Sequence, residues 1–166
     1  AAFKNAELQE VILPNTVTFI DKEAFAENKV IKTVYAINAT KIGEKAFYNC
    51  INIKNLFLGQ ITEIGAYSFY NACKNQYDVY GTTFRLNLFR LTNVPDGAFT
   101  NSGLGSFVAD FVDNIGKDAF SECAAIATLK INCLLRMPEG AFKGCASLNN
   151  VEIGNLSYIP RGAFST

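Results

Sequence analysis

The stretch LQEVILPNTVTFIDKEAF at residues 8–25 returns near the other end of the chain as CASLNNVEIGNLSYIPRGAF at residues 145–164. Both contain an aliphatic-x-x-aliphatic-x-aliphatic core, then another aliphatic position, and then an Ala-Phe pair. Self-similarity at a period of roughly 20–50 residues is the sequence signature of repeat architectures. The two stretches therefore predict a protein built from stacked copies of one small unit.

Phenylalanine marks the repeat most clearly. Eight of the 14 phenylalanines follow a small residue, and they recur at steps of 22, 22, 22, 30, 21, 22 and 22 residues. They are Phe3, Phe25, Phe47, Phe69, Phe99, Phe120, Phe142 and Phe164. One unit cannot bury its apolar edge alone, so this column predicts aromatic rings stacked inside a solenoid.

The rest of the unit predicts a strand and a turn. The core, as in Val11 and Leu13, alternates with the period of two that is typical of a short strand with one buried face. The aliphatic residue five positions before each Phe is often followed by Gly or Pro, which marks a turn. The segment from there through Ala-Phe is expected to form a helical turn or a 3-10 piece. We therefore expect a right-handed α/β-type solenoid with seven parallel strands, about 34 Å of sheet at about 4.8 Å per strand.

The pattern C/N-x-x-L-x-x-V-x-L-x-x-x-(V/I)-x-x-I-G-x-x-A-F, carried best by the two quoted stretches, resembles the leucine-rich repeats of the BspA-like or Treponema pallidum type. The resemblance covers nearly the whole chain, so residues 1–166 are expected to form a single leucine-rich repeat solenoid of about seven repeats. It implies a concave parallel β-sheet, with the short helical or 3-10 turns on the convex side. Proteins of this type are typically secreted or surface-attached, and many are linked to adhesion. The resemblance therefore also implies an extracellular or cell-surface location.

One interval of 30 residues interrupts the spacing. The extra residues fall near 74–83, a segment that carries Tyr77 and Tyr80. Such an insertion is either a tolerated loop outside the solenoid or a recognition loop, since loops often carry binding residues. The chain also begins and ends within a unit and has no polar capping units, so we expect a fragment of a longer protein.

Composition excludes several classes of function. The formal charge is zero, from 15 Lys and Arg against 15 Asp and Glu, which disfavours nucleic acids and anionic membranes as partners. No apolar run approaches the ~20 residues of a membrane span, so no membrane insertion is expected within this segment. Histidine is absent, and there is no P-loop, G-x-G-x-x-G motif or G-x-S-x-G elbow. We therefore expect no enzyme activity, no catalytic residues, no cofactor and no metal site.

The cysteines follow the repeat and not a metal-binding spacing. Cys50, Cys123 and Cys145 each lie three residues after a Phe of the column. One interpretation is a column of small buried side chains whose weak S–H groups face backbone carbonyls. The alternative is a disulfide between Cys123 and Cys145 in adjacent coils, which parallel stacking disfavours because both Cβ atoms then point the same way.

Candidate binding residues lie where the alternating core points outward. These outward positions carry large apolar side chains in the first half of the chain and more polar ones in the second. The predicted binding face consists of Ile12, Tyr35, Ile37, Phe57, Asn87, Phe89, Lys130 and Glu152. Clustered exposed apolar area usually marks an interface, but intramolecular cover, self-association and plain strand propensity would account for the same residues. Lys130 and Glu152 are expected to form a cross-strand pair.

These residues indicate a noncatalytic scaffold for protein binding or adhesion, part of a secreted or surface protein, that grips its partner with the concave sheet. A host extracellular-matrix or cell-surface protein is the partner that the resemblance implies. Two alternatives stay open, a structural spacer that presents another domain and a carbohydrate-binding module. The second is weaker, because tryptophan is absent and the exposed aromatics are mixed with aliphatics, whereas sugar platforms favour flat rings.

Overall fold

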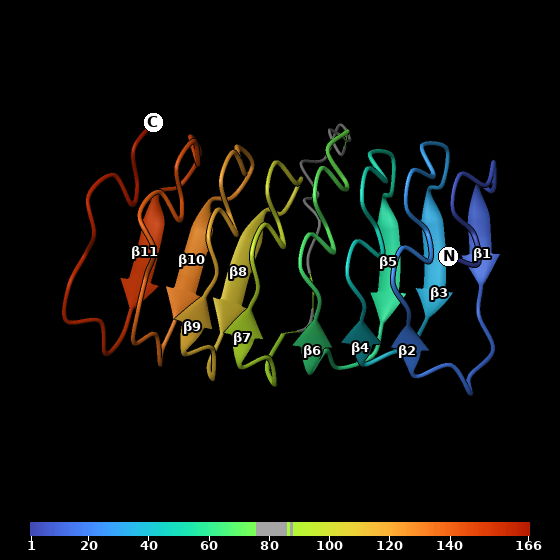
Figure 1. Ribbon diagram of the computed structural model, residues 1–166, viewed down its shortest axis with the longest axis horizontal. Coiled ribbons are helices and arrows are strands. Elements are labelled where there is room, and N and C mark those ends of the chain that lie inside the picture. The colour runs from blue at the N-terminus through green and yellow to red at the C-terminus, as the bar shows by residue number, and fades with distance from the viewer. Residues whose placement is uncertain (76–85, 87) are drawn as a thin grey trace.

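The computed structural model describes residues 1–75, 86 and 88–166, which form a parallel β-solenoid whose coils lie side by side along the long axis (Figure 1). The longer strands of successive coils make up one side of the solenoid, which we call the long-strand face. In the described part of the chain these strands are β1 (Glu10–Ile12), β3 (Thr33–Ala36), β5 (Asn55–Leu58), β8 (Ser106–Ala109), β10 (Thr128–Ile131) and β11 (Asn150–Ile153).

The long strands pair in parallel, as the repeat predicts. β1, β3 and β5 form one three-stranded sheet, and β8, β10 and β11 form another. Equivalent repeat positions lie opposite each other, as Val11 lies opposite Val34, and alternating residues such as Val34 and Phe107 are fully buried. The sequence predicts one more long strand, near Leu86 and Leu88, which falls between β5 and β8 in the chain. It includes residues outside the described part, and Leu88 itself is buried.

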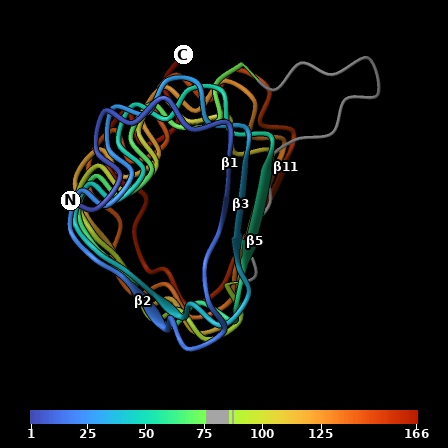
Figure 2. The same cartoon turned by 90° about the vertical axis from the view of Figure 1, so that its right-hand side faces the viewer.

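A second set of strands, each two residues long, forms another side of the solenoid. They are β2 (Phe19–Ile20), β4 (Lys41–Ile42), β6 (Glu63–Ile64), β7 (Asn93–Val94) and β9 (Asn114–Ile115), paired in parallel as β2-β4-β6 and β7-β9. Each strand buries its aliphatic residue and exposes its neighbour, as with Ile42 and Lys41. The sequence gives no sign of this sheet, because two residues are too few to show alternation. Figure 2 looks along the solenoid and shows β1, β3 and β5 on one side and β2 on another.

The phenylalanine column forms the predicted stack in the interior. From Phe3 to Phe164, successive ring centroids lie 5.1, 5.2, 5.4, 5.4, 5.4, 5.0 and 5.3 Å apart, and their planes are inclined by at most 16°. Phe69 and Phe99 flank the long interval, yet their rings are 5.4 Å apart and nearly parallel, at 2°. The insertion therefore leaves the stack continuous.

The Ala-Phe segments do not form the expected helical or 3-10 turns, and no helix of either kind occurs in the described residues. They form consecutive turns in which N–H groups alternate between two kinds of partner. Ala24 N and Ala26 N donate to carbonyls three residues back, whereas Phe25 N donates to Ala46 O of the next coil, at 2.8 Å. Glu23 also has a positive φ of 54°, which a right-handed helix does not allow. A helix needs these N–H groups for its own ladder, so the helical prediction is wrong. The segments form a third hydrogen-bonded side, which we call the turn face.

The cysteine column consists of buried thiols that donate to the preceding coil. The Sγ atoms lie 3.0, 2.8 and 3.2 Å from their carbonyl acceptors in the pairs Cys50–Phe25, Cys123–Phe99 and Cys145–Phe120. All five cysteines are free, so the buried-thiol interpretation is confirmed and the Cys123–Cys145 disulfide is not formed. Burial raises the pKa of Cys50 to about 12 and that of Cys123 to about 11, which leaves both thiols protonated and unreactive at neutral pH.

The structure describes little of the predicted insertion. Of residues 74–83 only Lys74 and Asn75 are described, and Tyr77 and Tyr80 lie outside the described residues. Asn75 is still tied to the preceding coil, because its N donates to Ile51 O (3.0 Å) and its Nδ2 to Asn52 Oδ1 (2.9 Å). The insertion thus begins from a residue held by the solenoid.

Candidate functional site

The long-strand face carries an apolar column across its first three strands. Parallel pairing places Ile12 opposite Tyr35 and Tyr35 opposite Phe57. Neighbouring strands are about 4.8 Å apart, so the Tyr35 and Phe57 rings stack, with centroids 4.8 Å apart and planes inclined by 9°. The side chains of Ile12 and Phe57 are 71% and 45% exposed, and Tyr35 between them is partly buried. The sequence-predicted residues Ile12, Tyr35 and Phe57 thus form one continuous outward surface, which we call the apolar column.

Two other predicted residues, Ile37 and Phe89, lie in turns and not on the strands. Ile37 follows the end of β3, in a turn, and is 55% exposed. Phe89 also lies in a turn and is 52% exposed. Asn87 lies outside the described residues. Ile37 comes two residues after Tyr35, beyond the end of β3, and neither Ile37 nor Phe89 belongs to the apolar column.

The other half of the long-strand face is polar and internally paired. Lys130 lies opposite Glu152, and its Nζ is 2.8 Å from the Glu152 carboxylate. The hydrogen bond and charge of Glu152 raise the pKa of Lys130 above its usual value. Asn132 Nδ2 donates to Asp110 Oδ1 at 2.7 Å. These polar side chains already bond to one another across coils, whereas the apolar column presents exposed apolar side chains that a partner could cover.

The turn face carries a tyrosine cluster that sequence analysis missed. The rings of Tyr48 and Tyr70 stack at 4.8 Å and 11°, and Tyr67 meets Tyr70 edge-on at 6.2 Å. The Lys45 ammonium lies 6.0 Å from the Tyr67 ring centroid. A signal was present, because Tyr48 and Tyr70 each directly follow a Phe of the column in adjacent units.

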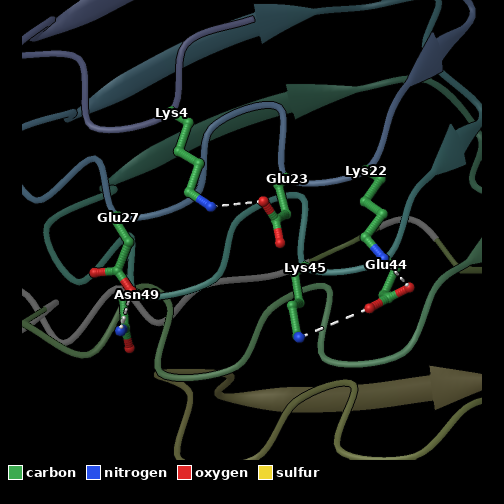
Figure 3. Close-up of polar contacts among 7 residues, drawn as sticks. All are labelled: Lys4, Lys22, Glu23, Glu27, Glu44, Lys45 and Asn49. Atoms are coloured by element: carbon green, nitrogen blue, oxygen red, sulfur yellow. Dashed lines mark hydrogen bonds and ion pairs between the residues drawn. The ribbon is translucent and has the colours of Figure 1, made fainter. Parts of the chain in front are cut away.

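Charged side chains of the turn face pair from coil to coil (Figure 3). Lys4 Nζ lies 2.6 Å from Glu23 Oε2, and Lys22 Nζ lies 2.8 Å from Glu44 Oε2. The hydrogen bonds from these lysines hold the pKa of both carboxyls below their usual values. The turn face is thus a neutral surface of alternating donors and acceptors.

An asparagine ladder continues this surface along the solenoid. Asn49 Nδ2 donates to Glu27 Oε1 (2.9 Å), Asn71 Nδ2 to Asn49 Oδ1 (2.9 Å), and Asn101 Nδ2 to Asn71 Oδ1 (3.1 Å). All four residues have positive φ, a conformation that asparagine tolerates better than most residues. The ladder therefore supports the left-handed positions of the turns.

No three His, Cys, Asp or Glu side chains in residues 1–75, 86 and 88–166 gather closely enough to hold a metal ion. Nor does this part of the chain contain a helix with the length and apolar character that crossing a bilayer requires.

The fold is similar to those of solved leucine-rich repeat proteins. No curated protein sequence matches the chain. A leucine-rich cell surface protein of Faecalibacterium prausnitzii A2-165 is similar in structure, with 23% identity, a TM-score of 0.53 and coverage of 89% of this chain. The T. pallidum leucine-rich repeat protein is similar with 20% identity, a TM-score of 0.63 and coverage of 90% of this chain. The chain spans 32% of the length of the first structure and 71% of the second.

The family assignment rests on the sequence itself. The pattern described as "BspA type Leucine rich repeat region (6 copies)" matches residues 1–87 and 82–166. These ranges contain the whole phenylalanine column, whose rings stack through every described coil. The chain belongs to the BspA-type leucine-rich repeat family, and its repeat fold is similar to those of the two solved leucine-rich repeat proteins.

Proposed function

We propose that this chain is a noncatalytic protein-binding scaffold of a secreted or surface protein, and that it contacts its partner through the apolar column. The observation that carries the proposal is the in-register alignment of Ile12, Tyr35 and Phe57, whose side chains lie on the outside of adjacent strands. Exposed apolar clusters of this kind usually mark an interaction site.

The column has the physical properties of a binding anchor. Each of its residues lies on a strand whose neighbouring residues are packed in the solenoid core, as Val34 and Ala36 flank Tyr35. The stacked rings of Tyr35 and Phe57 restrict each other, so less side-chain freedom is lost when a partner binds. Aromatic side chains contribute much of the energy in protein interfaces, and a tyrosine hydroxyl adds a polar contact.

The surface location and the adhesive role are further parts of this proposal. The family match and the similarity to a protein described as a cell surface protein support them. On this basis the partner is a host extracellular-matrix or cell-surface protein.

The test compares two double variants on the same face. Tyr35→Ser with Phe57→Ser removes the column, whereas Lys130→Ser with Glu152→Ser changes the same outward positions three or more coils away and serves as the matched control. Binding is measured on purified matrix proteins and on intact cells, with circular dichroism to show that both variants fold. We expect the column variant to bind roughly tenfold or more weakly and the control to bind like the wild type. Equal binding by the wild type and both variants would show that the apolar column is not the binding site. Failure of the wild type to bind any matrix protein or cell would contradict the adhesive role.

A further inference from the structure

A hollow on the turn face lies next to the tyrosine cluster. One residue after each Phe of the column, the first coils carry in order Lys4, Ala26, Tyr48 and Tyr70. Ala26 is the small residue of this series and is buried, so a space of about 200 Å³ remains beside it, between the ring of Tyr48 and Lys4. The lining residues are Lys4, Glu23, Ala26, Glu27, Lys45 and Tyr48.

One wall of the hollow is an aromatic ring that lacks a second ring partner on this side. Tyr48 stacks on Tyr70 at 4.8 Å, and the next coil on its other side carries Ala26, which has no ring. A flat or chair-shaped ring placed over Ala26 would continue the stack that Tyr70 and Tyr48 begin. The space is smaller than the roughly 300–1,000 Å³ of pockets that enclose drug-sized ligands, so it suits a single ring held against an open surface.

The rim supplies hydrogen-bonding groups without net charge. Two carboxylates, Glu23 and Glu27, and two lysines, Lys4 and Lys45, line the same space. Figure 3 shows Lys4 paired with Glu23 and Lys45 paired with Glu44, so the charges at the rim are matched. Lys4 donates to one oxygen of Glu23 (2.6 Å), and Asn49 donates to Oε1 of Glu27 (2.9 Å). A carboxylate has about four acceptor positions, so both retain capacity for a hydroxyl donor.

We propose that this hollow binds one pyranose ring of a neutral glycan. The C–H face of the sugar stacks on Tyr48, because polarised C–H groups are attracted to the negative face of an aromatic ring. The sugar hydroxyls donate to Glu23 and Glu27 and accept from Lys4 and Lys45. The balanced charge of the rim disfavours an anionic group and an arginine side chain alike. This site shares no residue with the apolar column, so a negative result at one site would leave the proposal for the other unchanged.

The test uses the whole chain and a panel of neutral hexose trisaccharides that differ in sugar and linkage. Amide chemical shifts of the wild type are followed during titration, and Tyr48→Ala is compared with Tyr158→Ala, which removes a tyrosine that is 70% exposed elsewhere. At least one trisaccharide is expected to bind with roughly millimolar affinity and to shift the amides of residues 23–27 and 45–48. Tyr48→Ala is expected to weaken that binding roughly tenfold, and Tyr158→Ala to leave it unchanged.

Three outcomes would overturn the proposal. They are no binding across the panel, shifts confined to other residues, and binding that Tyr48→Ala leaves intact. The shift map of the wild type decides the matter on its own if Tyr48→Ala fails to fold. An arginine-containing peptide that shifts the same amides while the sugars do not would also refute it, and would assign the hollow to a protein partner instead.

Discussion

Replacing Phe47 by Ala tests how much the ring stack contributes to stability. Phe47 is fully buried, and its ring lies 5.2 Å from Phe25 and 5.4 Å from Phe69. Removing a buried phenylalanine side chain typically costs about 3–5 kcal/mol. Two ring contacts are lost at once, each of about 0.5–1.5 kcal/mol beyond burial, so we expect the upper part of that range, about 4–5 kcal/mol.

Phe164 provides the matched control, because it belongs to the same column but has a ring neighbour on one side only, Phe142 at 5.3 Å. It is also only partly buried. Phe164→Ala is therefore expected to cost about half as much, roughly 2 kcal/mol. Urea unfolding followed by far-ultraviolet circular dichroism gives both values from the midpoints, provided that the slopes agree. Equal losses at the two positions, or a loss below about 2 kcal/mol at Phe47, would refute the stacked-core reasoning.

Three further predictions concern the core and the turns. Ser68 takes the place of alanine in the small-Phe pair, and its buried Oγ has no hydrogen-bond partner in the described structure; Ser68→Ala is expected to raise the free energy of unfolding by about 1 kcal/mol, and a decrease would show that the hydroxyl is satisfied. Gly97 and Gly140 hold the same repeat position with φ of 61° and 64°, but only at Gly97 would a new Cβ meet the Tyr67 ring. Gly97→Ala should therefore lower the thermal midpoint more than Gly140→Ala, and equal shifts would contradict this packing. Burial raises the pKa values of three thiols to about 11 or 12, whereas an unfolded thiol titrates near 8.5. The stability from the protonated thiols is complete below that value, and the free energy of unfolding should fall as the pH rises from 8 to 9.5. A flat profile in that window would contradict thiol burial.

The sequence predicted the interior well. Eight phenylalanines define the repeat, so one irregular interval of 30 residues does not obscure it. The spacing of Phe25, Phe47 and Phe69 placed their rings in one stack without any knowledge of the chain between them. The two-residue alternation likewise placed Ile12 and Tyr35 outward on neighbouring strands. Both features depend on which residues are apolar and how far apart they lie, and both can be read directly from the order of the residues.

The turn face could not be predicted in the same way. Glu23, Lys45 and Tyr67 adopt positive φ at one repeat position, although none of these residue types favours it. Hydrogen bonds to the next coil hold them there, as Glu23 N donates to Glu44 O at 2.9 Å. Such tertiary stabilisation leaves no local sequence signal, so the segment resembles a helical turn until the coils are stacked.

Amide hydrogen exchange across the insertion tests the central claim most directly, namely that the coils form one continuous body. Phe69 N donates to Ala98 O at 2.8 Å across the 30-residue interval, and Phe47 N donates to Ser68 O at 2.8 Å across an ordinary one. If the solenoid is continuous, the amide protons of Phe69 and Phe47 exchange with similar, strong protection. Rapid exchange at Phe69 beside a protected Phe47 would show two separate arrays of coils, and would contradict the account.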